Sequence, residues 1–392
     1  MPEVRLSVER REVKPLYRVP NMAEIAALPW NGFKVASTFS GAGGSSLGYK
    51  MAGFKVAWAS EFIPAAQDTY RANHNDTILD TRDIRTVQPE EVLAALKMQP
   101  GDLDLLDGSP PCASFSTAGK REAGWGKVKK YSDGSQRTDD LFDEFIRLVR
   151  GIRPKVFVAE NVSGLVKGTA KGYFLEILAA MKASGYRVTC RVLDAQWLGV
   201  PQQRQRTIFV GVREDLNREP VHPLPLAYRY SVRDALPWIT TIGSSDGYGE
   251  SHQVVSTRPY HTVGTGPQQG NGLARFVEAE TDISRYAIGA EWDKLKQGEQ
   301  SAKYFSLQRA SEASPSPAIL ASHGNTSTAG VTHPTEKRKF TIAELRRICA
   351  FPDDFILCGS YAQQWERLGR SVPPVMMYHI AKTLRDEVLC KL

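Results

Sequence analysis

The sequence predicts an α/β fold built on an open, doubly wound sheet, with a smaller and mostly irregular or β-rich region attached. Short apolar runs that end in glycine or a polar residue alternate along the chain with longer segments of helical apolar period. The first of these runs leads directly into a glycine-rich turn and a helix. With 392 residues, of which 42% are hydrophobic, the chain can bury a large core and form two domains.

Composition excludes several classes of protein. Residues 1–6 are charged and lack the apolar core of a signal peptide, and no later run approaches the length of a membrane span. We therefore expect a cytoplasmic protein that does not enter a membrane. The five cysteines form no closely spaced pairs, so we expect reduced thiols and neither a zinc site nor a disulfide framework. The net charge of +7 permits nucleic-acid binding but does not establish it.

The first candidate ligand site follows the first strand. Residues 33–39 read as a strand, and a turn with four glycines then opens a helix. Residues 55–60 read as a second strand that ends at Glu61. Glycines allow a ligand to approach the backbone at a helix N-terminus, and the carboxylate can accept from ribose hydroxyls, so we expect a nucleoside cofactor. The glycine spacing differs from the GxGxxG of dinucleotide enzymes. Asp83, after a third short strand, is either an acceptor for an adenine amine or a turn aspartate.

A candidate nucleophile lies on the next loop. Residues 103–106 read as a buried parallel strand, which continues through Asp107 and two prolines into Cys112. Open α/β folds bind ligands at the carboxyl ends of such strands, and the prolines stiffen the loop. Cys112 is therefore a candidate nucleophile, the alternative being a small buried hydrophobic residue. The basic residues 119–137 suit a flap over a phosphate backbone, or are simply solvated charge.

Further strand ends carry polar side chains. The elements expected here are a helix capped by Thr138, strand 156–159, a helix at about 172–184, a strand at about 186–194 and strand 207–210. Glu160 and Asn161 come off one strand end, so Glu160 and Cys112 can face one cavity. Arg204 and Arg206 alternate just before a strand and are expected to point to one side.

In these residues the sequence resembles the DNA (cytosine-5)-methyltransferase family. The family's motifs occur here in the family's order, and the ordered set is far more specific than any one motif. They are Phe39-Ser40-Gly41-Ala42-Gly43-Gly44, Glu61, Asp83, Pro111-Cys112 with Phe115-Ser116, Glu160-Asn161-Val162, Gln202 with Arg204 and Arg206, residues 346–355, and Gly369-Arg370-Ser371-Val372-Pro373-Pro374. The block at 214–335, rich in Pro, Gly, Ser and Thr, matches none of them.

The resemblance implies a Rossmann-like, S-adenosylmethionine-dependent methyltransferase sheet with a smaller target recognition domain. The expected boundaries are a lead-in at 1–32 with no assigned chemistry, a catalytic and cofactor-binding domain at 33–213 completed by 358–392, and a target recognition domain at 214–357. Within the recognition domain, residues 256–265 and 314–322 are loosely similar pieces that could reach the major groove. Helices are expected at about 341–349 and 375–388, the second of them beside the glycine turn.

The family's chemistry assigns roles to individual residues. Carbon 5 of cytosine is too weak a nucleophile to take a methyl group from a sulfonium, so a thiolate must first add to carbon 6. The resemblance gives that step to Cys112, protonation of N3 to Glu160 and contact with the O2 side of the ring to Arg206. Asn161 and Arg204 are expected to support the base or the loop. A base then removes the carbon 5 proton, Cys112 leaves, and the whole reaction requires a cytosine flipped out of the duplex.

The resemblance also implies the binding residues. The cofactor is S-adenosyl-L-methionine, held by Phe39, Gly41, Gly43, Gly44, Glu61, Phe62, Asp83, Ile84 and Ser371. The expected DNA contacts are Ser116, Lys120, Arg121 and Gln202, and no metal is expected. The chain departs from the family at Ala113, where glutamine is usual, and at Arg370, where asparagine is usual. Arg370 is expected either to bind the methionine carboxylate or to lie on the surface against a DNA phosphate.

The expected substrate is a specific sequence in double-stranded DNA. The expected protein is a monomer, cytoplasmic and nucleoid-associated, with a cognate restriction endonuclease as a separate protein. Three alternatives stay open. A tRNA cytosine-5 methyltransferase of the same family shares the motifs, but the long variable block favours duplex DNA. A catalytically silent DNA-binding relative would lack a site residue, and none is lost. A dehydrogenase would explain Glu61 and the glycines but not Cys112 and Glu160.

Overall fold

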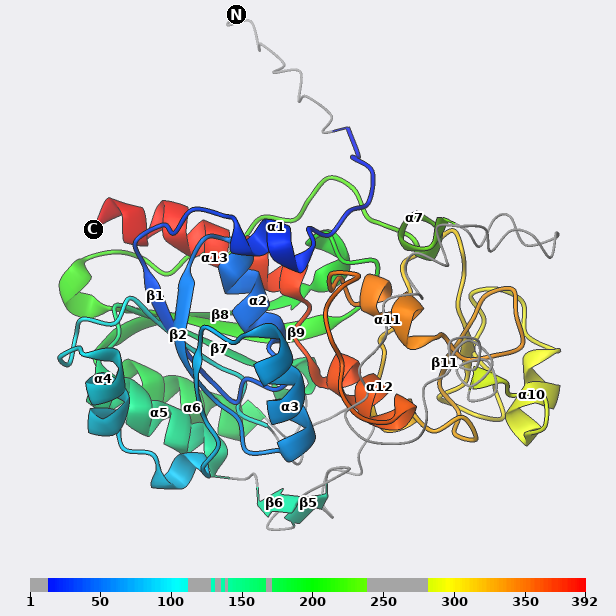
Figure 1. The fold of residues 1–392 in the computed structure, drawn as a ribbon, viewed down its shortest axis with the longest axis horizontal. Coiled ribbons are helices and arrows are strands. Elements are labelled where there is room, and N and C mark those ends of the chain that lie inside the picture. Colours follow the sequence, from blue (N-terminus) through cyan, green and yellow to red (C-terminus); the bar gives the residue numbers. More distant parts are fainter. Residues whose placement is uncertain (1–12, 112–127, 131–134, 138–139, 167–170, 238–280) are drawn as a thin grey trace, which may run out of the picture.

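The computed structural model describes residues 13–111, 128–130, 135–137, 140–166, 171–237 and 281–392. In this part of the chain, seven strands form one sheet in the order β3-β2-β1-β4-β7-β9-β8. The strands are β1 (Lys34–Thr38), β2 (Lys55–Ser60), β3 (Ile78–Asp80), β4 (Leu105–Gly108), β7 (Val156–Val162), β8 (Tyr186–Asp194) and β9 (Gln205–Arg213). The predicted α/β fold class is confirmed, and the carboxyl ends of β1, β2, β4 and β7 lie along one edge of the sheet (Figure 1).

One strand direction was not anticipated. Strands β1, β2, β3, β4 and β7 pair in parallel, whereas β9 inserts between β7 and β8 and runs antiparallel to both. In this register Val162 of β7 lies opposite Arg206 of β9. The start of β9 therefore meets the carboxyl end of β7, which brings Arg206 to the strand end that carries Glu160.

Helices cover both faces of the sheet. The helices α4 (Pro89–Leu96), α5 (Leu141–Ile152) and α6 (Lys171–Lys182) pack on one face, and α2 (Gly44–Met51) and α13 (Pro374–Glu387) pack on the other (Figure 1). The helix α3 (Pro64–Asn73) connects β2 to β3. The N-cap residue of α5 is Asp140, so the predicted capping role of Thr138 was wrong. Part of the predicted basic flap forms a short antiparallel pair, β5 (Val128–Lys130) and β6 (Ser135–Arg137).

The C-terminal helix packs against the helix that follows the glycine turn, as expected. Gly48 of α2 is in such close contact with α13 that a Cβ atom there would lie 2.5 Å from Cβ of Met377 and 2.6 Å from the carbonyl oxygen of Pro374. Only glycine allows this approach. The carboxyl-terminal end of the chain thus returns to the first βα unit and covers its face.

A second region lies beside the sheet and has its own core (Figure 1). Its elements are α7 (Val232–Ala235), α10 (Ala287–Trp292), β10 (Gln308–Arg309), β11 (Val331–Thr332), α11 (Ile342–Ile348) and α12 (Tyr361–Arg370). Helix α12 was not predicted. The core of this region also includes Ile25 of α1 (Met22–Ala26) and Leu47 of α2, so the N-terminal lead-in and the glycine helix both pack against it. In the described residues no helix has the length and apolar character needed to cross a membrane.

Candidate active site

A cavity of about 1020 Å³ opens at the carboxyl ends of the parallel strands. Its wall combines the glycine turn, the ends of β2, β4 and β7, the start of β9, the last turn of α12 and a segment of the second region. The predicted site residues in this wall are Phe39, Gly41, Gly44, Glu61, Phe62, Ile84, Glu160, Asn161, Arg206 and Ser371. Gly43, Asp83, Gln202 and Arg204 do not line it.

The glycine turn and Glu61 form one hydrogen-bonded unit. The backbone N–H of Gly41 donates to Oε2 of Glu61 at 2.7 Å, and the N–H of Ile63 donates to Oε1 at 2.7 Å. Glu61 is buried, and burial raises the pKa of its carboxyl, while the two amides and the charge of Arg367 act against this rise. Each carboxylate oxygen has a further lone pair, so Glu61 can still accept from two hydroxyls on a ligand in the cavity.

The glycine turn has an unusual backbone conformation and close packing. Phe39, which precedes it, has a φ of 53°, and Gly41 has a φ of 55°. Left-handed backbone is uncommon for a residue other than glycine and marks a site where the surroundings fix the chain. Gly43 acts through packing: a Cβ atom there would lie 2.2 Å from Nε2 of His74. At Gly44 a Cβ atom would lie 2.3 Å from the carbonyl oxygen of Val372, so the turn lies directly against the segment that follows α12.

The region of Asp83 differs from the sequence expectation in detail. The Asp83 side chain caps a short 3-10 helix by accepting from the N–H of Arg85, and it forms an ion pair of 3.0 Å with the Arg85 guanidinium. Arg85 also pairs with Asp140 at the start of α5. Ile84, the next residue, is buried and reaches the cavity. Asp83 thus fixes the position of Ile84 in the cavity wall.

The opposite end of the cavity holds a buried ion pair. Nε of Arg206 lies 2.6 Å from Oε1 of Glu160, and both side chains are largely buried. Burial raises the pKa of Glu160, and the charges of Arg206 and Arg204 and a hydrogen bond from Ser109 counteract it. Nδ2 of Asn161 donates to the carbonyl oxygen of Pro110 at 3.1 Å. The end of β7 is therefore tied to the loop that leads to Cys112.

Two residues of the turn before β9 are structural. The Arg204 guanidinium donates to the carbonyl oxygens of Ile319 at 3.1 Å and Gly369 at 2.8 Å, and burial lowers its pKa to about 9. Gln202 has no exposed surface, and its amide contacts Sγ of Cys349 at 3.2 Å. The prediction that Gln202 contacts DNA is wrong for this structure, because the side chain lies inside the protein and joins the sheet to the second region.

Several wall residues were not predicted. Ser109 hydrogen-bonds Glu160, and Glu366 and Arg367 lie on the last turn of α12. The charged residues 366 and 367, just before the Gly369 motif, were visible in the sequence and could have marked them. The segment 318–322, part of a predicted DNA-reaching piece, also contributes to the wall. Cys112, Ala113, Ser116, Lys120, Arg121 and the piece 256–265 lie outside the described residues.

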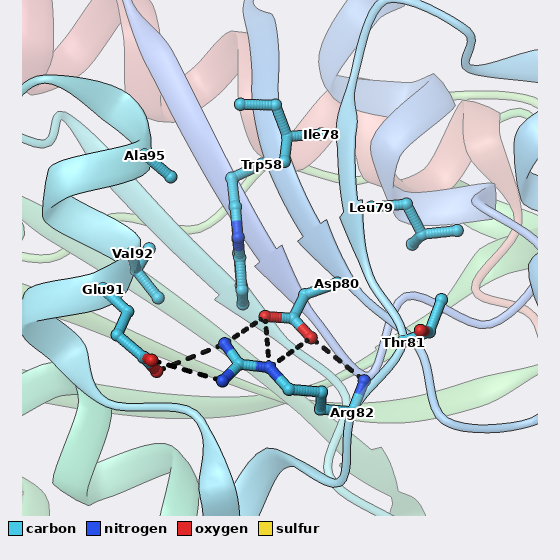
Figure 2. A pocket seen from close by; sticks show the side chains of 9 residues that line it. All are labelled: Trp58, Ile78, Leu79, Asp80, Thr81, Arg82, Glu91, Val92 and Ala95. Atoms are coloured by element: carbon cyan, nitrogen blue, oxygen red, sulfur yellow. Dashed lines mark hydrogen bonds and ion pairs between the residues drawn. The ribbon is translucent and has the colours of Figure 1, made fainter.

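A smaller hollow of about 300 Å³ lies between the edge of the sheet and α4 (Figure 2). Arg82 crosses it and pairs with Asp80 at 2.7 Å and with Glu91 at 3.2 Å. The charges in this hollow are thus satisfied by one another. Arg82 also lines the large cavity, whose wall contains most of the predicted site residues that the structure describes.

Comparison with known proteins identifies the family. Residues 33–386 match the profile described as C-5 cytosine-specific DNA methylase. Type II methyltransferase M.NgoFVII of Neisseria gonorrhoeae is 30% identical over 356 residues, which cover 90% of this chain and 86% of the relative. Type II methyltransferase M.DdeI of Desulfomicrobium norvegicum is 30% identical over 385 residues, which cover 89% of this chain and 88% of the relative.

A solved structure agrees on the fold. A mutant of Spodoptera frugiperda DNMT2 has a TM-score of 0.59 at 17% identity, covering 90% of this chain and 100% of that one. At this identity the likeness shows the fold alone, which is the Rossmann-like methyltransferase fold.

The family profile covers most of the chain. The chain therefore belongs to the C-5 cytosine-specific DNA methylase family and is a DNA (cytosine-5)-methyltransferase.

Proposed function

We propose that the protein transfers a methyl group from S-adenosylmethionine to carbon 5 of a flipped-out cytosine within a specific sequence of duplex DNA. The observation that carries this proposal is the buried pair of Glu160 and Arg206, 2.6 Å apart, in the cavity wall that also includes Pro111. Pro111 immediately precedes Cys112 in the chain. A thiol, a carboxyl and a guanidinium are the three groups that activation of a cytosine ring requires.

Each group has a separate task in the proposed reaction. The Cys112 thiolate forms a bond to carbon 6, and the electron pair displaced from the ring moves toward N3 and O2. Glu160 donates a proton to N3, which burial favours because it raises the pKa of the carboxyl. Arg206 donates toward O2. Carbon 5 of the resulting enamine would then take the methyl group that S-adenosylmethionine supplies, leaving S-adenosylhomocysteine. Loss of the carbon 5 proton to a base restores the double bond between carbons 5 and 6 as the bond from Cys112 to carbon 6 breaks, and N3 returns its proton to Glu160.

The residues at the glycine turn fit a nucleoside cofactor. The Glu61 carboxylate keeps lone pairs for ribose hydroxyls, Phe39 and Phe62 supply apolar faces, and buried Ile84 adds a third apolar side. Bound S-adenosylmethionine would supply an electrophilic methyl group. The chain's part is to bind and orient it in the cavity that also contains Glu160, so that cofactor and base share one cavity.

The relatives suggest the biological setting. Both are named Type II methyltransferases, and we propose a restriction-modification role in which a separate cognate endonuclease recognises the same DNA site. We further propose that residues 214–357 form the target recognition domain. Grafting this block from a relative should move the methylated sequence in the chimaeras that stay active. Active chimaeras that keep the original site would assign recognition to another part of the chain.

Two experiments test the catalytic proposal. Bisulfite sequencing of DNA and tRNA from a methylation-deficient host that expresses the protein should show new 5-methylcytosine at one DNA sequence, whereas modification of tRNA alone would refute the DNA assignment. DNA with 5-fluorocytosine at that site should trap the enzyme covalently, because fluorine at carbon 5 blocks the elimination. Cys112→Ala should abolish methyl transfer and trapping but keep cofactor binding, whereas Cys190→Ala should behave like wild type. A trap that forms without Cys112 would refute its role.

A further inference from the structure

The segment 320–328 carries the chain from the wall of the large cavity to the protein surface. Its first three residues line the cavity, and Ser322, Asn325 and Ser327 are exposed. No acidic residue occurs between positions 313 and 335 of the chain. This stretch, which we call the rim segment, therefore presents hydroxyl and amide groups beside the cavity and no carboxylate.

Helix α12 supports the rim segment from one side. Nε1 of Trp365 donates to the carbonyl oxygen of Leu320 at 2.9 Å. A Cβ atom at Gly324 would lie 2.9 Å from the carbonyl oxygen of Ala362 and 3.0 Å from Cβ of Trp365, so the segment lies directly against the helix. The last turn of the same helix lines the cavity. The rim segment is thus fixed to an element that already belongs to the site.

Lys339 supports the rim segment from inside the protein. Its side chain has no exposed surface, and Nζ lies 5.1 Å from the centre of the Trp365 ring. Nζ donates to the carbonyl oxygens of His323 and, at 2.7 Å, of Asn325, and it lies 3.4 Å from Oγ1 of Thr328. These three oxygens match the three donors of an ammonium group. A buried ammonium group is costly without a carboxylate partner, yet among the described residues all its acceptors belong to this one segment.

The location of the rim segment suits a phosphate group. A nucleotide that rotates into a cavity leaves its phosphates at the entrance, because they remain part of the DNA backbone. Hydroxyl and amide groups donate to phosphate oxygens without reading the base. The rim segment has such groups at the edge of the cavity, no carboxylate to repel an anion, and a buried cation behind it.

We propose that the rim segment binds a phosphate next to the flipped cytosine through Ser322 and Asn325, and that Lys339 is the positioning residue that holds the segment. This inference rests on the proposed function and adds a contact with the target strand. DNA does not reach Lys339, because its side chain is buried. Lys339 instead fixes the backbone that carries Ser322 and Asn325, so that less freedom is lost when DNA binds.

Fluorescence anisotropy with a duplex that contains the methylated site tests the phosphate contact. Asn325→Asp keeps the oxygen that accepts from the backbone N–H of Ser327 at 3.2 Å and adds a negative charge. It should weaken DNA binding about 5- to 10-fold at low salt, less at high salt, and leave the methylated sequence unchanged. Ser322→Ala should weaken binding about 2- to 10-fold.

A matched control adds the same charge elsewhere. Asn217 is exposed, accepts from Arg187 at 3.2 Å and follows the end of β9 that is remote from the cavity. Asn217→Asp should therefore leave DNA affinity within about twofold of wild type, because the added charge lies more than a Debye length from the bound phosphate.

Steady-state kinetics test the positioning role of Lys339. Lys339→Met should raise KM for DNA about 10-fold and leave kcat within about twofold, whereas a general loss of folded enzyme would lower kcat alone. Trp365→Phe, which removes the donor to Leu320 but keeps a ring, should raise KM about 2- to 10-fold. Lys155→Met removes an ammonium group that pairs with Asp104 at 2.7 Å and should not change KM. Calorimetry should give unchanged affinity for S-adenosylmethionine in all these variants.

The outcomes separate this inference from the proposed function. Equal losses of DNA affinity in Asn325→Asp and Asn217→Asp, or no loss in either, would show that the rim segment does not bind a phosphate. A changed methylated sequence in Asn325→Asp would mean that the segment reads bases, and the inference would be wrong. A lower kcat with unchanged KM in Lys339→Met and Trp365→Phe would leave Lys339 with a role in folding alone. If wild type binds no DNA, the proposed function itself is wrong.

Discussion

Asp107 is a buried carboxyl group on β4 with a predictable effect on stability. Ser37 Oγ donates to its Oδ2 at 2.9 Å, and the Tyr49 hydroxyl donates to its Oδ1 at 3.1 Å. Burial raises the pKa of Asp107 from 3.8 to about 7, the two hydroxyls oppose this rise and the nearby charge of Glu160 adds to it. We predict that the stability of Asp107→Asn, measured relative to wild type, is greater above neutral pH than at acidic pH.

The direction follows from proton binding. Between the unfolded pKa of 3.8 and the folded value of about 7, the folded protein keeps a proton that the unfolded chain has lost. Stability rises with pH only where the unfolded state binds more protons, so the Asp107 contribution is greatest at low pH and falls as pH rises toward about 7. For these two pKa values, the loss between about pH 5.5 and about pH 8 amounts to about 2 kcal/mol.

Urea denaturation of wild type and Asp107→Asn at both pH values tests this. Other groups titrate in the same range, so the relevant quantity is the unfolding free energy of the variant minus that of wild type. This difference should rise by about 2 kcal/mol from about pH 5.5 to about pH 8. Asp104→Asn, one residue before the same strand, removes a carboxylate paired with Lys155 at 2.7 Å and should destabilise the protein at both pH values. An Asp107→Asn difference that is the same at both pH values would show that Asp107 is already ionised in the folded protein.

Three further substitutions test the packing described above, each by urea denaturation. Gly48→Ala should cost about 1–3 kcal/mol, because the new methyl group would overlap Met377 and push α2 away from α13. Tyr17→Phe should cost about 1 kcal/mol, because the Tyr17 hydroxyl donates to the carbonyl oxygen of Arg347 at 2.6 Å and ties the N-terminal lead-in to α11. Lys339→Met should cost about 2–3 kcal/mol, because the buried ammonium group donates to the carbonyl oxygens of His323 and Asn325, and these would lose their donor.

The sequence predicted the sheet better than the helices of the second region. Strand β2 was predicted at its observed limits because it is a mostly apolar run with polar ends, and the edge strand β8 because its apolar and polar residues alternate. Helix α12 was missed although Tyr361, Trp365 and Leu368 follow a helical period. Most of its other residues are polar, so the apolar period is short and weak. The antiparallel β9 was not foreseen, since strand direction depends on which neighbour the chain joins.

The motifs named residues that share one cavity wall, but they did not predict the partners of these residues. The pairing of Arg206 with Glu160 follows once the strand order is known, because β7 and β9 are neighbours. The acceptors of Arg204 do not follow from the strand order, since Ile319 and Gly369 lie 115 and 165 residues further along the chain. Alternation along a strand gave no information about them. A motif therefore predicts which side chains gather at one cavity more reliably than it predicts what each one contacts.

The turn before β9 connects residues 316–322 of the second region with the start of β9 in one short stretch of chain. The N–H of Gln203 donates to the carbonyl oxygen of Ser316 at 2.8 Å, and the N–H of Ser316 donates to the carbonyl oxygen of Pro201 at 2.9 Å. Arg204 adds its bond to the carbonyl oxygen of Ile319, which lies within the part of this segment that lines the cavity. Arg206, two residues further on, meets Glu160. A shift of the 316–322 segment would therefore be transmitted through about two residues to the carboxyl group proposed to protonate cytosine, because buried hydrogen bonds resist independent movement of the parts they connect.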